Sequence, residues 1–301
     1  MDSIKDFSME RPVLEQFGSV GFQASNIGEA VSLIEKMKRE KATIFLSFTA
    51  NLIASGLRGI IAEICRKKFV DAIITTAGSI DHDIIKTLLP YQKGSFGADD
   101  AELHKKGISR IGNIFVPAKG FELLEGEMQK WLEEWCSKKS CFPPSEISAL
   151  AGSKLESPQS FLHWCSKNKI PVFCPGITDG AIGLQFYFFL QQHKDFCINA
   201  AADLTKLGQI VLDADKTGGI VLGGGISKHH LIGANILRDG LDYAVYISTA
   251  TELDGSLSGA RTHEAKSWGK LREKAENVNV FCDATIAFPL IAESLRKKKI
   301  L

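Results

Sequence analysis

Short apolar segments recur along the chain, and each one ends in small or polar residues that lead into a helical pattern. The segments are rich in Val and Ile and only a few residues long, which is typical of strands buried on both faces of a sheet. We predict strands at Thr43–Phe48, Asp71–Ile74, Pro171–Phe173, Gly219–Leu222, Tyr243–Ile247 and Val278–Phe281.

Amphipathic stretches separate these segments. Ile27–Arg39 and Ser55–Lys68 carry apolar residues at i, i+3 and i+4, which predicts helices with one buried face. Phe121–Lys138 is a longer and more charged amphipathic stretch, and Phe288–Lys298 closes the chain. This alternation predicts an α/β fold, with a single doubly wound, mostly parallel sheet, Rossmann-like, and helices on both faces. Because the composition does not shift along the chain, we expect a single domain over residues 1–301.

Composition narrows the class of protein. Of the 301 residues, 45% are hydrophobic and 24% are charged, which excludes a disordered chain, a collagen and a small disulfide scaffold. The net charge of +1 gives no reason to expect binding to nucleic acid or to a membrane surface. The longest mostly apolar run, Ala181–Leu190, is half of the roughly 20 residues that a membrane-spanning helix needs.

The ends of the chain and its cysteines indicate a cellular compartment. No charged, then apolar, then small-residue leader opens the sequence, so we expect no signal peptide and a cytoplasmic protein. The seven cysteines are scattered and form no CxxC motif. We therefore expect a reducing environment and buried thiols.

The residues that follow the predicted strands are small, hydroxylated, or Asn and Asp. A parallel sheet binds ligands beyond the carboxyl ends of its strands, where glycines and helix N-termini can approach a phosphate. Any one such loop is explained as well by ordinary helix capping. Together, the loops favour a nucleotide-like ligand.

The segment Gly223–His230 reads GGGISKHH and lies between a predicted strand and a predicted helix. It is not a GxGxxG motif, so by itself it is a weak dinucleotide signature. His229 and His230 would point about 100° apart on a helix, so we expect at most one of them in a site. No further Cys, His or carboxylate stands at metal-ligand spacing, and we predict no metal site.

The densest polar stretch is Asp254–Lys270. Glu264 and Trp268 would share a helix face, and an extended chain at Gly269 would turn Trp268 and Lys270 to the same side. A carboxylate, an indole and a lysine suit a cationic ligand, and a lysine in a dry pocket near other cations becomes a nucleophile. An ordinary surface helix with a core Trp explains the stretch about as well. The chain has no GxSxG motif, which argues against a triad hydrolase.

These segments together resemble the deoxyhypusine synthase family, and the resemblance runs from about Gly21 to Leu290. The chain is similar to the compact archaeal members, because it lacks a long N-terminal extension. The matching segments are GFQASN (21–26), SFTANLIASGLR (47–58), TTAG (75–78), ISRIGNIFVP (108–117), PVFCPGITDG (171–180), GGGISKHH (223–230), DYAVYISTA (242–250), DGSLSGA (254–260), SWGK (267–270) and DATIAFP (283–289).

The resemblance implies a reaction, a cofactor and a protein partner. The family uses NAD to oxidise spermidine, holds the resulting 4-aminobutyl group as an imine on an enzyme lysine, and passes it to one lysine of translation factor five-A. Family members are homotetramers whose sites are shared between paired subunits.

The resemblance also assigns residues. Lys270 corresponds to the nucleophile and His229 to the proton acceptor near the amine. The substrate-binding positions are Glu264, Trp268, Asp81, Gly255 and Ser256. The NAD-binding positions are Asn51, Thr76, Ala77, Gly78, Asp179, Gly224, Thr249, Ala250, Asp254, Asp283 and Ala284.

The chain departs from the eukaryotic members at positions that face the substrate. Leu184 and Leu257 stand where those members carry acids, and His82 replaces an acid near the NAD ribose. An amine with a different charge, such as agmatine or putrescine, is therefore an alternative donor. A homospermidine synthase-type enzyme with a free diamine acceptor is an alternative function, as is a non-catalytic paralogue that binds NAD or amine.

Overall fold

The computed structural model describes residues 3–301, and the chain divides into two compact units. The sheet unit comprises residues 3–48, 67–74 and 204–301, and the helical unit comprises residues 49–66 and 75–203. The expectation of one domain over residues 1–301 stays a prediction.

The sheet unit is built on parallel strands in the order β11-β10-β9-β1-β2. In the central pair, Leu46 of β1 stands opposite Ile220 of β9. Both strands are almost completely buried, as their apolar sequences predict. In the edge strand β11, by contrast, buried residues stand between exposed and half-buried ones. The strands are β1 (Thr43–Phe48), β2 (Ala72–Ile74), β9 (Thr217–Leu222), β10 (Leu241–Ile247) and β11 (Leu271–Val280).

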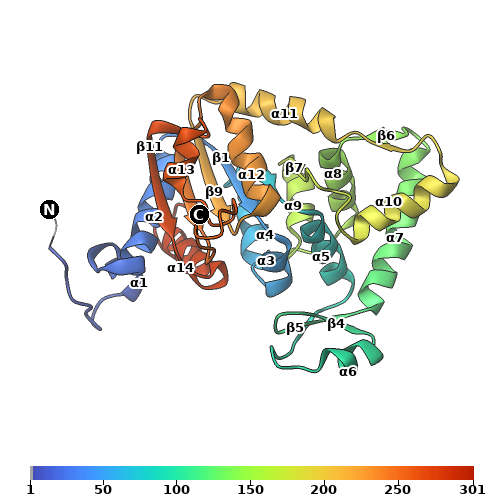
Figure 1. Ribbon diagram of the computed structural model, residues 1–301, viewed down its shortest axis with the longest axis horizontal. Helices are drawn as coiled ribbons and strands as arrows, with labels where there is room; N and C mark the ends of the chain where they lie inside the picture. Colours follow the sequence, from blue (N-terminus) through green and yellow to red (C-terminus); the bar gives the residue numbers. More distant parts are fainter. Residues whose placement is uncertain (1–2) are drawn as a thin grey trace. The chain divides into compact units, whose positions relative to one another are not determined.

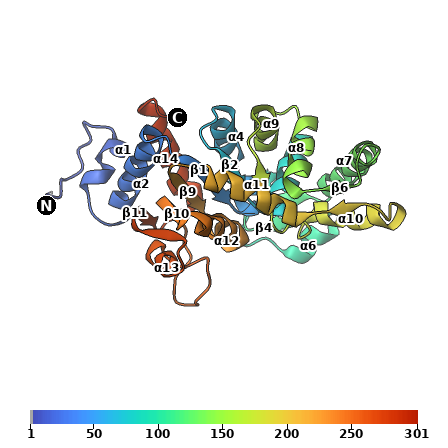
Figure 2. The same ribbon diagram turned by 90° about the horizontal axis from the view of Figure 1, so that it is seen from above.

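Helices cover both faces of these strands. Two of them, α2 (Phe22–Arg39) and α14 (Ala284–Lys297), pack against one another and against β10, and α12 (Gly225–Ala234) packs against β1 and β9. Figure 2 shows α2 and α14 on one side of the strands and α12 on the other. The shorter helices of the unit are α1 (Val13–Gln16), η1 (Phe17–Ser19), η2 (Asn235–Arg238) and α13 (Thr262–Ser267), and α11 (Ala200–Leu212) begins in the helical unit and ends in this one.

The helical unit contains most of the helices in the middle of the chain (Figure 1). They are α3 (Ala50–Ser55), α4 (Arg58–Arg66), α5 (Ala77–Leu88), α6 (Asp100–Lys105), α7 (Lys119–Cys136), α8 (Pro144–Lys154), α9 (Phe161–Asn168) and α10 (Ala181–Gln192). An antiparallel sheet joins β3 (Gln92–Lys93), β5 (Ile114–Pro117) and β4 (Ile108–Ile111), and a short parallel pair joins β6 (Cys141–Phe142) to β8 (Cys197–Ile198). The unit also holds β7 (Val172–Phe173).

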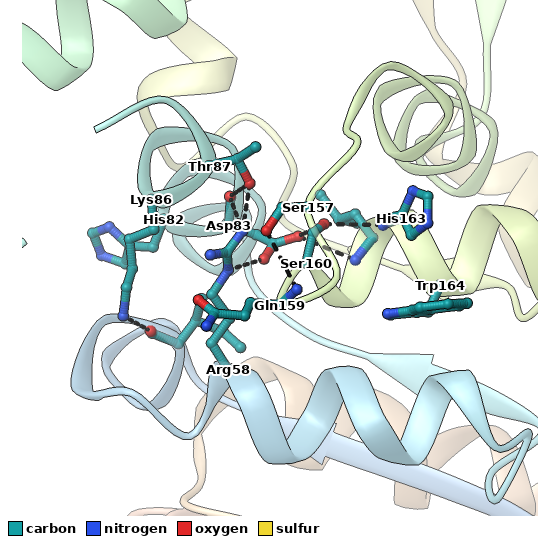
Figure 3. Close-up of polar contacts among 12 residues, drawn as sticks. Arg58, His82, Asp83, Lys86, Thr87, Ser157, Gln159, Ser160, His163 and Trp164 are labelled. Atoms are coloured by element: carbon teal, nitrogen blue, oxygen red, sulfur yellow. Dashed lines mark hydrogen bonds and ion pairs between the residues drawn. The ribbon is translucent and has the colours of Figure 1, made fainter. Parts of the chain in front are cut away.

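A buried ion pair fastens three helices of the helical unit together (Figure 3). The Arg58 Nε atom on α4 donates to Asp83 Oδ1 on α5 at 2.5 Å, and both side chains are almost completely buried. Asp83 Oδ2 accepts from the Ser160 hydroxyl at 2.6 Å and from the Leu162 N–H at 3.1 Å, at the start of α9. Each carboxylate oxygen therefore has a partner, which a buried charge requires.

The predicted fold class is confirmed, and three local predictions are wrong. The helix predicted at Ser55–Lys68 is the shorter α4 (Arg58–Arg66), because Ser55 belongs to α3, which Gly56 ends with a left-handed φ of 112°. The last strand starts at Leu271, well before the predicted Val278, because an edge strand needs apolar residues on one face only. The thiols are not all buried, since Cys197 is exposed and Cys141 is half-buried. Across residues 3–301, no helix has the length and apolar character that crossing a membrane would need.

Candidate active site

Lys228 is the buried cation of the candidate site in the sheet unit. It lies on α12, directly after β9, and only 2% of it is exposed. Its Nζ atom donates to the carbonyl oxygens of Leu257 at 2.8 Å and Ala260 at 2.5 Å, and it lies 4.6 Å from the centroid of the Tyr246 ring. Burial lowers the pKa of Lys228 to about 8, although the charge of Glu264 acts in the opposite direction.

These bonds hold the polar loop 251–261 against α12. A further bond runs from the Gly225 N–H to the Ser258 hydroxyl at 3.0 Å. At the exposed tip of the loop, Asp254 accepts from the Ser256 N–H at 2.8 Å, and this bond lowers the pKa of Asp254. Gly255 and Ser256, the predicted substrate contacts, are therefore exposed to solvent. Lys228 holds the same loop from its buried side.

The end of α13 sets the position of Lys270. Gly269 takes a left-handed φ of 64°, and the Lys270 N–H returns to the Ala265 carbonyl at 2.9 Å. The Lys270 Nζ atom lies 5.0 Å from the centroid of the Trp268 ring. The predicted juxtaposition of Trp268 and Lys270 is confirmed, but the expected extended chain is wrong, because a left-handed turn after the helix brings them together.

Burial differs sharply among the predicted substrate residues. Lys270 is 8% exposed, whereas Trp268 is 65% exposed and Glu264 is also exposed. These three residues and Lys228 line one cavity of about 20 Å³. The buried Lys270 thus shares the cavity with an exposed indole and an exposed carboxylate. This arrangement suits a cationic ligand.

His229 is the exposed member of the histidine pair, and His230 is half-buried. The pKa of His229 is lowered by burial and by the charge of Lys270. The pKa of His230 is lowered by burial and by His229. The expectation that at most one of the two histidines belongs to a site stays a prediction, and the lowered pKa of His229 leaves its imidazole free to accept a proton at neutral pH.

Tyr246 and Lys228 are site residues that the sequence reasoning missed. The Tyr246 hydroxyl is buried and makes no hydrogen bond within residues 3–301. Its side chain lines the cavity of Lys270 and also a neighbouring cavity of about 30 Å³ beside Gly223, Ser248 and Ala250. A buried hydroxyl without a partner is costly, so a polar ligand group there would be favoured. Both residues belong to the matched motifs, but only their burial in the structure sets them apart from the other residues of those motifs.

The predicted cofactor residues of the sheet unit gather at one edge of the sheet. They follow β9, β10 and β11, which are neighbours in the strand order. The Ala250 N–H donates to the Ser248 hydroxyl at 3.0 Å, and Asp283 caps α14 by accepting from the Thr285 N–H and hydroxyl, both at 2.6 Å. The predicted residues at this edge are Gly224, Thr249, Ala250, Asp254, Asp283 and Ala284.

The helical unit carries the other predicted cofactor residues, which are Asn51, Thr76, Ala77, Gly78 and Asp179. Thr76 precedes α5 but makes no capping bond with its side chain, and its hydroxyl is buried without a hydrogen-bond partner in the described chain. The N–H groups of the first turn of α5 and this hydroxyl can together hold an anionic group. Asn51 Oδ1 accepts from the Thr49 hydroxyl at 2.5 Å, and Asp179 is exposed.

Asp81, predicted as a substrate ligand, also has a structural role in the helical unit. Its carboxylate accepts from the N–H groups of Ala181 at 2.8 Å and Ile182 at 2.9 Å, so it caps α10. Burial raises the pKa of Asp81 to about 6, although both hydrogen bonds act in the opposite direction. The adjacent His82 is buried, its ring hydrogen-bonds the Tyr91 hydroxyl at 2.7 Å, and burial lowers its pKa to about 4.

Comparison with known proteins agrees with the motifs. The family model described as deoxyhypusine synthase matches residues 12–295. The "Probable deoxyhypusine synthase" of Thermoplasma acidophilum is 48% identical over 281 residues, which cover 93% of this chain and 91% of that protein. The deoxyhypusine synthase of Senecio vernalis is 42% identical over 318 residues, covering 95% and 86%.

The fold agrees as well. A crystal structure from Entamoeba histolytica that carries the same family name has a TM-score of 0.71 and 26% sequence identity, and the match covers 96% of each chain.

Proposed function

Since the chain belongs to the deoxyhypusine synthase family and is a transferase, we propose that it moves the 4-aminobutyl group of spermidine to one lysine of translation factor five-A. The observation that carries this proposal is the enclosed amine of Lys270, which shares a cavity with Glu264 and Trp268. A buried amine beside an exposed indole and an exposed carboxylate matches a covalent site for a cationic substrate.

NAD is the cofactor that we propose, and the chain offers groups that fit it. Within residues 3–301, the hydroxyls of Thr76, which follows β2, and of Tyr246, in the last part of β10, have no hydrogen-bond partner, and Thr76 gives α5 no side-chain cap. When bound, NAD supplies the acceptor for the hydride that spermidine loses and the donor that later reduces the product imine. The carboxylates that we propose to contact it are Asp283 and Asp254 in the sheet unit and, taken separately, Asp179 in the helical unit.

Lys270 carries out the transfer itself. Its neutral amine adds to the imine carbon of the oxidised substrate, and the bond from that carbon to the nitrogen of diaminopropane breaks as this nitrogen takes up a proton. An imine on Lys270 results, with no net oxidation or reduction in the step. The amine of the acceptor lysine then attacks the same carbon and releases Lys270.

The surrounding residues bind the amine and move protons. Glu264 pairs with an ammonium group of the substrate, and the face of the exposed Trp268 ring attracts the same charge. His229 accepts a proton from the reacting amine, since its lowered pKa leaves the imidazole neutral at pH 7. Lys228 keeps the loop that carries Gly255 and Ser256 in place.

The preferred amine depends on Leu184 and Leu257. Leu184 is 57% exposed on α10, and Leu257 is half-buried above Lys228. An ammonium that faced a leucine would be desolvated without a partner. We therefore propose that the far end of spermidine stays in water, or that an amine with fewer charges is the donor.

A turnover assay tests the proposed function. Diaminopropane release from spermidine is measured with translation factor five-A, with the same factor after its acceptor lysine is replaced by arginine, and with putrescine as a free acceptor. With spermidine labelled in its 4-aminobutyl group, we expect the label to appear on the intact factor only. Label on putrescine without label on the factor would identify a homospermidine synthase-type enzyme, and no release with any acceptor would identify a non-catalytic paralogue.

We also propose a cytoplasmic homotetramer, as the family resemblance implies. The exposed apolar side chains of Leu184, Tyr187 and Phe188 on α10 support association, because a lone chain leaves them in water. Light scattering after size-exclusion chromatography measures the assembled mass, and a monomer at micromolar concentration would contradict the proposal.

A further inference from the structure

Cys141 and Cys197 stand directly opposite one another in the short parallel pair of β6 and β8. The Cys197 N–H donates to the Ser140 carbonyl at 2.8 Å, and the Asn199 N–H donates to the Phe142 carbonyl at 2.9 Å, so the register is fixed on both sides of the pair. Residues opposite one another in parallel strands direct their side chains to the same face of the sheet.

The spacing of the two cysteines matches that of a disulfide. Neighbouring strands lie about 4.8 Å apart, which falls within the roughly 4.4–6.8 Å between Cα atoms that disulfides allow. The neighbouring Cys197 raises the pKa of the Cys141 thiol, as expected when two thiols lie close together. Cys197 is exposed and Cys141 is half-buried, so a small molecule in solution reaches the pair.

A second pair of neighbouring cysteines shows why solvent access matters. Cys65 on α4 and Cys165 on α9 lie on two helices that pack together, but both thiols are buried. Burial raises the pKa of the Cys165 thiol far above its ordinary value. Because the thiolate is the reactive form, this pair is shielded both chemically and sterically.

We propose that Cys141 and Cys197 are a redox modification site and form a reversible disulfide when they meet a small-molecule disulfide. Cys197 loses its proton to solvent, and its thiolate attacks one sulfur of the small disulfide and releases one thiolate. Cys141 then loses its proton to solvent, and its thiolate attacks Cys197 Sγ and releases the second thiolate. The two protein thiols are oxidised, and the small disulfide is reduced to two thiols.

The disulfide would link the segment that follows α7 to the segment that follows α10 in the helical unit. Cys141 follows α7, and Cys197 follows α10, so the closed loop runs from residue 141 to residue 197 and contains α8, α9 and α10. Closing a loop of this length restricts the unfolded chain. The oxidised protein should melt several degrees higher than the reduced protein, by the usual relation between stability and melting temperature.

The test uses the full-length protein with oxidised glutathione as the probe. We expect each chain to lose two hydrogens by intact mass, and a non-reducing peptide map to link the peptides of Cys141 and Cys197. Dithiothreitol should restore both thiols and the lower melting temperature. Cys141→Ser and Cys197→Ser should each abolish the link, whereas Cys136→Ser, which changes a half-buried cysteine at the end of α7, should retain it.

Three results would overturn the proposal. The first is a stable glutathione adduct on Cys197 with Cys141 still open to alkylation. The second is a link that involves Cys136 or Cys65, or that joins two chains. The third is a link between Cys141 and Cys197 that forms only after the protein is unfolded in urea. None of these results bears on the proposed transfer reaction, since neither cysteine takes part in it.

Discussion

The Nζ atom of Lys270 lies 5.0 Å from the centroid of the Trp268 ring, although Lys270 is buried and Trp268 is mostly exposed. The left-handed Gly269 between them produces this arrangement by ending α13 and turning the chain back into β11. A substrate that reached the amine of Lys270 would therefore pass the face of the indole.

Lys270→Arg should abolish transfer and leave NAD binding unchanged, because a guanidinium stays protonated and cannot form the imine. Borohydride reduction during turnover with labelled spermidine should place the label on Lys270 in the wild type. Label on the neighbouring Lys228 or Lys266 would show that the nucleophile is misassigned.

Lys228→Met should alter the pH dependence of stability. The pKa of Lys228 falls from 10.5 in the unfolded chain to about 8 in the folded one. Between these values the unfolded state binds the extra proton, so the wild type should gain free energy of unfolding relative to Lys228→Met as the pH rises from 8 to 10.5. Urea titrations of both proteins across this range provide the measurement, and parallel curves would contradict the assignment.

Asp81→Asn should show the opposite trend at acidic pH. Burial raises the pKa of Asp81 from 3.8 to about 6, so between these values the folded state holds a proton that the unfolded state has lost. The wild type should therefore lose free energy of unfolding relative to Asp81→Asn as the pH rises from 3.8 to 6.

The same variant separates the two roles of Asp81. If the carboxylate also binds the amine, Asp81→Asn should raise the KM for spermidine at pH 8, where Asp81 is ionised. An unchanged KM together with the shifted stability profile would leave Asp81 as a cap of α10 alone.

Asp283→Asn should weaken NAD binding while leaving the stability of α14 nearly unchanged, because the amide oxygen still accepts from Thr285. Asp283→Ala removes the cap as well and should cost about 1 kcal/mol of stability in addition. Calorimetric titration with NAD and with spermidine compares the two ligands. An equal loss of both affinities in Asp283→Asn would indicate a general folding defect.

Arg58→Met should destabilise the protein by about 3–5 kcal/mol, because it leaves the buried carboxylate of Asp83 without its cation. The matched control is Arg66→Met, which breaks an exposed ion pair with Glu63 on the same helix and should cost less than about 1 kcal/mol. Chemical denaturation of the two variants gives the comparison, and similar costs would show that burial does not determine the strength of the pair.

The sequence by itself determined the class of fold and the family, and it named the candidate residues of the site. β1 coincides with the predicted Thr43–Phe48. A strand covered on both faces is apolar along nearly its whole length, and such a run can be recognised from the sequence alone. The SWGK and GGGISKHH motifs similarly made Lys270 and His229 the candidate catalytic residues through the family resemblance, since both motifs consist of residues that are adjacent in the chain.

Only the tertiary structure decided which polar groups are buried. Lys228 reads as one more helix lysine in the sequence, and its depressed pKa arises because loop 251–261 and Tyr246 enclose it. The register that sets Cys141 opposite Cys197 likewise depends on the pairing of strands that are far apart in the chain. Burial and pairing of this kind depend on which distant segments meet, and the local pattern of apolar and polar residues does not encode that information.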